Sequence, residues 1–335
     1  MKTKQIIGIV VAGLTFIIVC VSSMAANKFI GTSVQKSFTE TLKEMEKSDV
    51  ELPEDDYVGI VRVEGTMQDT GSSSSIFGTE GYDHQGLLEQ VENFMDDDEN
   101  KGILLYVNSP GGTVNAADEL YLKLMEYKKE TSRPIYVYMA DEACSGGYYV
   151  SVAGDKIYAN RNTWTGSIGV YIQLSNLKGL YDKLGIKTNF IKAGKNKTMG
   201  SDSQELTEEQ EAIFQSLVDE AYEQFVDVIV AGRTKLTEQQ IRTAADGRIY
   251  TSAQAKQVGL IDDIKTYDEV VELVEKELGE DIEIYDSSEE DDSFWSFLNS
   301  KLNILTDKKE KTETEQLLEL AKKYGSGVPM YYAMH

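Results

Sequence analysis

Histidine, cysteine and positive charge are scarce in this chain, and each shortage excludes a class of protein. Two of the 335 residues are cysteines, Cys20 in an apolar N-terminal run and Cys144, so neither a disulfide framework nor a cysteine-based zinc site is expected. Lysine and arginine number 33 against 57 aspartates and glutamates, which gives a formal net charge of −24. Phosphate binding needs clustered basic side chains, so nucleic acid is not expected as a partner.

The shortage of histidine limits the catalytic arrangements open to the chain. The two histidines are His84, in a Tyr-Asp-His-Gln context typical of a loop or cap, and the terminal His335. A Ser-His-Asp triad is therefore not expected, and a nucleophilic serine would need a lysine as its base. Such a lysine must be partly desolvated, because only the neutral amine accepts a proton.

The chain starts with a segment that fits a membrane anchor. Residues 6–26 are apolar and uncharged, and about 20 such residues cross a bilayer. The lysines before them and the acidic sequence after them predict a single-pass protein of the cell membrane, with residues 1–5 as a cytoplasmic stub and the bulk of the chain extracytoplasmic. The alternative is a cleaved signal peptide, because residues 23–25 (Ser-Met-Ala) resemble a cleavage site. Residues 27–56 are polar and are interpreted as a juxtamembrane linker.

Residues 57–285 carry the alternation of strand and helix patterns that is typical of one α/β domain. This alternation predicts βαβ units with right-handed crossovers and a mainly parallel sheet. The expected strands are 58–63, 102–107, 134–139, 156–159, 168–172 and 187–191, and the expected helices are 86–95, 116–129, 146 onward, 174–184, 207–232 and 267–278, with shorter helices within 236–258. Residues 286–335 are interpreted as an acidic hinge and a C-terminal tail.

The stretch Ala143-Cys144-Ser145-Gly146-Gly147 lies where the strand at 134–139 gives way to a helix. A nucleophile at such a place meets the unpaired N–H groups of a helix start, which stabilise a developing oxyanion. The two glycines let other backbone approach closely. The alternative is a serine that only caps the helix, which is the usual role of an isolated Ser-Gly-Gly.

A second turn, Asn108-Ser-Pro-Gly-Gly112, joins the strand at 102–107 to the next helix. By itself, Pro-Gly-Gly is common turn chemistry. The two turns follow strands that are successive in the sequence, so in a parallel sheet both should open at the edge where ligands bind. One turn would then supply oxyanion donors and the other the nucleophile.

One stretch stands out among the many lysines as a source of the base. Residues 191–200, Ile-Lys-Ala-Gly-Lys-Asn-Lys-Thr-Met-Gly, hold three lysines and two glycines just past an expected strand. The alternative interpretation is a solvated basic loop.

Four motifs together resemble those of the signal peptide peptidase A family, membrane-anchored bacterial Ser/Lys proteases. They occur in order as Asn108-Ser-Pro-Gly-Gly112, Ala143-Cys-Ser-Gly-Gly-Tyr-Tyr149, Thr165-Gly-Ser-Ile-Gly169 and Gly194-Lys-Asn-Lys197. The resemblance covers roughly residues 57–278, in the short form with one N-terminal anchor. It implies a ClpP/crotonase-like βαβ superhelical fold.

Carried over by position, the resemblance implies that Ser145 is the nucleophile, Lys197 the general base and Ser167 a hydrogen-bonding partner of that lysine. The oxyanion donors would be the backbone N–H groups of Gly111, Gly112 and Gly146. Neutral Lys197 would take the proton of Ser145, and the acyl-enzyme would be hydrolysed by water that the same lysine activates. Cys144 replaces the usual alanine and is expected to be a small buried residue. No metal or cofactor is implied.

The resemblance also implies what the protein acts on and how it assembles. Its substrates would be cleaved signal peptides and other membrane-proximal peptides. The enzyme would be a ring-like homo-oligomer in which serine and lysine come from adjacent subunits, and the wide apolar face of the helix at 207–232 would suit such an interface. The alternatives are a crotonase-type acyl-CoA enzyme and a catalytically inactive membrane scaffold.

The chain ends in an apolar run, residues 328–334, which follows Gly325-Ser-Gly327. One hypothesis is that this run docks in the substrate groove as a self-inhibitory or self-processed peptide. The alternative is an ordinary packed terminus.

Overall fold

The computed structural model describes residues 52–69, 82–279 and 282–287 and the strand at 330–332. The helices and strands of these described residues lie in the unit that spans Pro53 to His335. Within the described residues, no helix combines the length and apolar character that a membrane crossing requires. The expected anchor at 6–26 lies outside these residues, and the domain boundaries expected from the sequence stay predictions.

The described residues form an eight-stranded sheet whose main path runs β7-β6-β4-β2-β1-β9, with β5 paired to β4 and β8 paired to β5. The strands are β1 (Tyr57–Glu64), β2 (Asn100–Ser109), β4 (Ile135–Cys144), β5 (Lys156–Ala159), β6 (Trp164–Gly166), β7 (Ile249–Thr251), β8 (Asp263–Ile264) and β9 (Glu283–Tyr285). Every pair of neighbours runs parallel except β6 and β7. The predicted α/β class with a mainly parallel sheet is therefore confirmed.

Strand β4 changes neighbours along its length. Its residues 136–139 pair with β5, whereas residues 142–144 pair with β6. The end of β4 is therefore held by a different strand from its start. Because the N–H of Ser145 donates to the carbonyl of Gly166 at 2.7 Å, the contact with β6 continues one residue past the strand.

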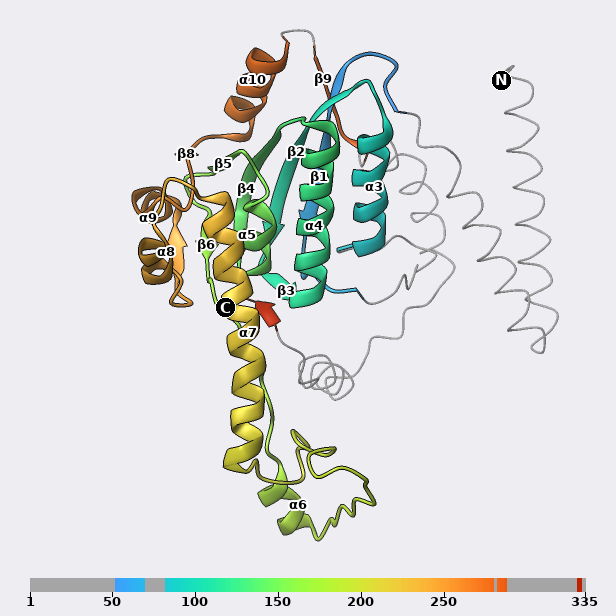
Figure 1. Ribbon diagram of the computed structural model, residues 1–335, viewed down its shortest axis with the longest axis vertical. Coiled ribbons are helices and arrows are strands. Elements are labelled where there is room, and N and C mark those ends of the chain that lie inside the picture. Colours follow the sequence, from blue (N-terminus) through green and yellow to red (C-terminus); the bar gives the residue numbers. More distant parts are fainter. Residues whose placement is uncertain (1–51, 70–81, 280–281, 288–329, 333–335) are drawn as a thin grey trace, which may run out of the picture. The chain divides into compact units, whose positions relative to one another are not determined.

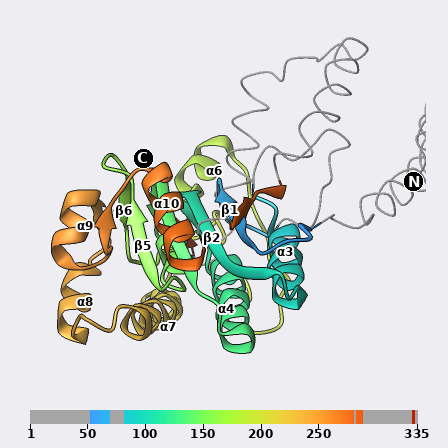
Figure 2. The ribbon, with the colours of Figure 1, turned by 90° about the horizontal axis from the view of Figure 1, so that it is seen from above.

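Helices α3 (His84–Asp96), α4 (Val114–Thr131) and α5 (Gly146–Ser151) lie on one face of the sheet, and α10 (Tyr267–Leu278) packs on the other (Figures 1 and 2). Alternate residues of the strands serve the two faces. Ile60 belongs to the buried cluster that includes Val270 of α10, whereas a Cβ at the preceding residue, Gly59, would come within 2.3 Å of the Phe94 ring of α3. The small residue lets α3 approach the sheet.

The long helix α7 (Glu208–Gly232) is buried over only part of its length. It begins with a capping box between Thr207 and Gln210, as the sequence predicts, and its buried apolar residues Phe225, Val226 and Ile229 all lie near its C-terminal end. Farther toward its start, Leu217 is 43% exposed. The wide apolar face predicted for this helix is therefore covered by the chain itself only in part.

Residues 169–209, which we call the arm, contain no buried residue. The arm carries α6 (Lys178–Leu184) and lies beyond the N-terminal end of α7, away from the sheet (Figure 1). The strands expected at 168–172 and 187–191 are absent from it, so those two predictions are wrong. The helix expected at 174–184 forms only as the shorter α6, and helices α8 (Glu238–Ala244) and α9 (Ser252–Val258) confirm the short helices expected after α7.

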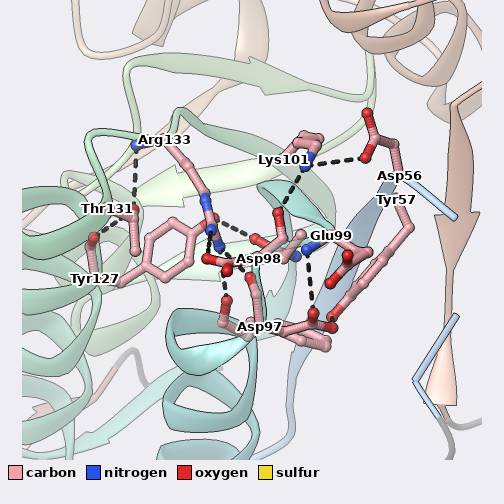
Figure 3. A network of polar contacts seen from close by, with 11 residues as sticks. Asp56, Tyr57, Asp97, Asp98, Glu99, Lys101, Tyr127, Thr131 and Arg133 are labelled. Atoms are coloured by element: carbon pink, nitrogen blue, oxygen red, sulfur yellow. Dashed lines mark hydrogen bonds and ion pairs between the residues drawn. The ribbon is translucent and has the colours of Figure 1, made fainter. Parts of the chain in front are cut away.

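A polar network ties the amino-terminal ends of β1 and β2 to α3 and α4 (Figure 3). Arg133 donates to two carbonyls at the end of α3, at 3.0 and 2.7 Å, which satisfies groups that a helix terminus leaves unpaired. The Tyr57 hydroxyl donates to Asp97 at 2.7 Å, and the Tyr127 hydroxyl donates to the buried Asn100 at 2.5 Å. Burial and the bond to Asp97 raise the pKa of Tyr57, so this hydroxyl stays protonated. The network fixes the end of the sheet that lies opposite Ser145.

Candidate active site

Ser145 lies between β4 and α5 in a strained backbone conformation. Its φ of 53° and ψ of −114° lie in a region that residues other than glycine rarely adopt. The side chain is 1% exposed, and among the described residues its Oγ is the buried side-chain oxygen or nitrogen that has no hydrogen-bond partner. A buried, unsatisfied hydroxyl on strained backbone costs stability, and such costs cluster at functional sites.

The two glycines after Ser145 pack directly against the second predicted turn. A Cβ at Gly146 would lie 3.2 Å from the Cα of Gly111 and 3.3 Å from the backbone nitrogen of Gly112. A Cβ at Gly147 would lie 2.7 Å from the carbonyl oxygen of Ser109. The start of α5 and the turn after β2 therefore touch, as expected for turns that end successive strands.

This turn contains the short strand β3 (Gly111–Thr113), and two backbone hydrogen bonds and one to a side chain fix it. Met67 donates to the carbonyl of Gly111 at 2.9 Å and accepts from Thr113 at 2.8 Å, while the N–H of Gly111 donates to the hydroxyl of Ser109 at 3.1 Å. In this structure the N–H of Gly111 is bonded within the turn, and its role as an oxyanion donor stays a prediction. The N–H groups of Gly112 and Gly146 are the other two predicted donors. Sequence reasoning did not find Met67 or Ser109.

Ser167 reaches the site through the main chain of β6. Ser145 donates to the carbonyl of Gly166, the residue before Ser167, at 2.7 Å. The N–H of Ser167 donates to Arg248 at 2.8 Å, and its φ of 50° is a second positive value in this region. The structure therefore brings Ser145, Ser167, Gly112 and Gly146 to one place.

Lys197 is not brought to that place within one chain. It is exposed on the arm, where the neighbouring Asn196 accepts a 3.5 Å hydrogen bond from Gln210 at the start of α7. Near the other end of α7, Gln224 donates to the hydroxyl of Tyr149, one helical turn after Ser145, at 3.1 Å. The two glutamines are separated by about 21 Å along the helix, at 1.5 Å per residue. The serine and the lysine of one chain are therefore far too distant to exchange a proton.

Two other candidates for nucleophile or base have different roles. Cys144 is fully buried, as predicted, and burial with the nearby Glu142 carboxylate raises the pKa of its thiol to about 12. The thiol is therefore protonated at neutral pH and unreactive. His84 is buried between Tyr82 and Glu119, at 2.8 Å from each, at the start of α3. Within the described residues, no group of three or more His, Cys, Asp or Glu side chains could hold a metal ion.

The described part of the C-terminal tail lies beside the same turn. Strand β10 (Met330–Tyr332) pairs antiparallel with β3, with Tyr331 opposite Gly112. The carbonyl of Gly111 and the N–H of Thr113 bond to Met67 on one side of β3. The N–H and carbonyl of Gly112 therefore point to the other side, toward β10. The hypothesis that the tail docks beside the site agrees with this pairing, and the same groups would meet any extended peptide laid along β3.

An α/β fold and a strained, unpartnered serine hydroxyl beside the turn of Gly112 form a site of the kind that hydrolases use. Residues 127–280 match the model of Peptidase family S49. The chain is similar to a protein of Enterococcus faecium named "Putative signal peptide peptidase SppA", with 40% identity over 215 residues, 64% of this chain and 62% of that protein. It is 30% identical to "Serine protease SPPA, chloroplastic" of Arabidopsis thaliana over 210 residues, 62% of this chain and 30% of that protein. The chain covers less than two thirds of the length of these relatives.

Proposed function

We propose that this protein is a serine endopeptidase in which Ser145 is the nucleophile. The observation that carries the proposal is the Ser145 hydroxyl, buried without a partner on strained backbone beside the N–H groups of Gly112 and Gly146. A structural serine would have its hydroxyl satisfied, whereas a nucleophile needs its oxygen free for a carbonyl carbon. The match to Peptidase family S49 and the names of the relatives support the same reaction class.

The base in this proposal is Lys197 of a neighbouring copy. About 21 Å of α7 separates Gln210, beside Lys197, from Gln224, beside the helix that follows Ser145. This distance supports a lysine from another copy as the base for Ser145. The arm also exposes apolar side chains that a second copy would cover, among them Leu184 at 64% and Ile191 at 105%. A ring-like homo-oligomer would place the arm of one subunit over the serine of the next, with Ser167 as hydrogen-bonding partner of the incoming lysine.

The chemistry of the assembled site follows from these groups. Ser145 Oγ attacks the scissile carbonyl carbon while the neutral Nζ of Lys197 takes the hydroxyl proton, and the resulting oxyanion lies beside the N–H groups of Gly112 and Gly146. The C–N bond then breaks, and the leaving amine takes the proton back from the lysine. Water deprotonated by the same lysine attacks the ester, which releases the acid product and restores the serine.

The substrate in this proposal is an extended peptide that pairs antiparallel with β3, as β10 does. The relatives' names and the apolar segment at 6–26 support cleaved signal peptides and other membrane-proximal peptides as substrates. The anchor would hold a ClpP/crotonase-type domain outside the cytoplasm. The C-terminal tail, which occupies the substrate edge of β3, would act as a self-inhibitory segment that substrates displace.

A fluorophosphonate probe tests the proposal directly, because an activated serine oxygen attacks its phosphorus, displaces fluoride and becomes phosphonylated. Treatment of the full-length protein followed by peptide mapping should place the label on Ser145, with none on the heat-denatured protein or on Ser145→Ala. Labelling of another serine, or efficient peptide hydrolysis by Ser145→Ala, would overturn the assignment.

A further inference from the structure

The last residue of β2, Ser109, is fully buried, and its hydroxyl bridges two separate stretches of main chain. Its Oγ donates to the carbonyl of Gly65 at 2.6 Å and accepts from the N–H of Gly111 at 3.1 Å. Gly65 follows β1 and itself donates to the carbonyl of Asn108 at 3.0 Å. The hydroxyl thus joins the ends of two neighbouring strands to the turn that carries Gly112.

This bridge decides how the turn is oriented. Gly111 has a φ of 97° and no side chain, and the preceding Pro110 has no N–H, so neither residue can hold the turn by itself. The Ser109 hydroxyl accepts a hydrogen bond from the N–H of Gly111, and the N–H of Met67 donates to the Gly111 carbonyl at 2.9 Å. With both polar groups of Gly111 fixed, the next peptide unit presents the N–H of Gly112 beside Gly146.

The same residue also contacts the helix that follows the nucleophile. A Cβ at Gly147 would approach the carbonyl oxygen of Ser109 to 2.7 Å and its Cβ to 3.4 Å. The main chain of Ser109 is therefore a surface on which the first turn of α5 rests, while its hydroxyl holds the opposite turn. One residue sets the spacing between the two candidate donors, Gly112 and Gly146.

We propose that Ser109 is a positioning residue whose hydroxyl holds the N–H of Gly112 where the oxyanion develops. This inference rests on the proposed peptidase activity, although Ser109 itself touches no reacting atom. Oxyanion donors act through preorganisation, so a turn that can shift by a fraction of an ångström loses part of the stabilisation of the transition state. The loss falls on the chemical step, because the edge of β3 that pairs with a peptide is still present.

The experiment compares Ser109→Ala with a matched control, Ser252→Ala. Ser252 on α9 is also fully buried and also donates its hydroxyl to main-chain carbonyls, of Asn160 and Thr163, but it lies beyond β4 and β6 from the turn. In Ser109→Ala we expect kcat to fall roughly 10- to 100-fold with KM changed by less than about threefold. In Ser252→Ala we expect kcat to stay within about twofold of wild type. Ser109→Thr keeps the hydroxyl and should recover most of the lost kcat, with Ser109→Cys, a weaker donor and acceptor, as the substitute if threonine prevents folding.

Two further readouts separate positioning from stability. Affinity for a peptide boronate, which forms a tetrahedral adduct on the serine, should fall in step with kcat/KM, whereas affinity of a non-reactive peptide should not. Hydrogen–deuterium exchange of a fragment spanning residues 105–115 should quicken in Ser109→Ala and return in Ser109→Thr. The exchange measurement does not depend on peptidase activity, so it separates failure of this inference from failure of the proposed function. Unchanged exchange, or a kcat loss no larger than that of Ser252→Ala, would overturn the proposal.

Discussion

The two ends of the central strands are built in opposite ways. At the amino-terminal end, Arg133, Asp97 and the tyrosines around them satisfy one another's polar groups (Figure 3). At the carboxyl-terminal end, Ser145 lies on strained backbone with a buried hydroxyl that has no partner. The first end contributes stability, and the second keeps a reactive atom free at a cost in stability that the rest of the sheet offsets.

The largest expected effect concerns Ser145, at the carboxyl-terminal end of the strands, and Lys197, which we propose reaches it from a neighbouring copy. Ser145→Ala and Lys197→Ala should each reduce kcat/KM by about 10³-fold or more, since dyad members act as a unit. Thermal stability should not fall in either variant, because Lys197 is exposed and the buried Ser145 hydroxyl has no hydrogen-bond partner to lose. When the two inactive variants are mixed under conditions that exchange subunits, roughly a quarter of the wild-type activity should return, as random neighbours pair intact serines with intact lysines. A mixture that stays inactive although exchange is complete would contradict a site shared between copies.

The next effect concerns the oxyanion turn. A Cβ at Gly112 would lie 1.8 Å from the carbonyl oxygen of Met67, so Gly112→Ala must separate the turn from Met67 and disturb the contact of the turn with Gly146. We expect kcat to fall by about 10²- to 10³-fold, as when an oxyanion donor is lost. Gly247→Ala is a control for the loss of a glycine without a clash, since nothing lies within 4 Å of its Cβ position, and its φ of 87° adds a backbone strain that Gly112 does not have. Equal kcat values for the two variants would remove Gly112 from the catalytic machinery.

The amino-terminal end should show the reverse pattern. Arg133→Met keeps the length of the side chain but leaves the last carbonyls of α3 unpaired, which should lower the free energy of unfolding by about 1–3 kcal/mol. The kcat/KM of the folded fraction should stay within about twofold of wild type, since the site lies at the other end of the strands. Chemical denaturation and steady-state kinetics measure the two quantities. A kinetic loss that exceeds the loss of folded protein would break the division between the two ends.

The smallest effect concerns the tail. Removal of residues 326–335 should raise kcat/KM for short peptides by a fewfold, because β10 no longer competes for the edge of β3. Tyr331→Pro, which removes the N–H opposite Gly112, should do the same without shortening the chain. A control peptide with the tail sequence, added to the truncated protein, should inhibit it. Equal kinetics in truncated and full-length protein would assign β10 to simple packing.

The elements that the sequence predicted well are those with a strong periodic pattern and a partner in the same chain. The strand and helix patterns at 156–159 and 267–278 match β5 and α10 residue for residue. The pattern at 187–191 looks equally strand-like, but Ile191 at its end is fully exposed and none of the strands in the described residues pairs with it. The expected strand at 168–172 formed instead at 164–166, where Thr165 is buried and the positive φ of Gly166 ends it. The spacing of apolar residues indicates that one face of a segment is buried, but it does not show whether the same chain or another copy covers that face.

The sequence predicted which turns lie together but not how each backbone group is bonded. The turns around Gly112 and Ser145 follow successive strands of a parallel sheet, so topology alone predicts that they touch. The bond that the N–H of Gly111 makes depends on one hydroxyl, that of Ser109, and a serine two residues before a turn glycine is a known way to hold a turn. That signal is too common to select this serine without coordinates. The separation of Lys197 from Ser145 depends on the length and direction of α7, which follow from packing.

The distance between Ser145 and Lys197 also gives the proposed enzyme a dependence on mass action. In the proposed enzyme an isolated chain would hold half of a catalytic unit, so it would cleave no peptide before it assembles with other copies. Specific activity would then rise with protein concentration until the subunits saturate one another, and dilution alone would silence the enzyme. Anchoring to a membrane surface would raise the local concentration of subunits and so favour the assembled, active form.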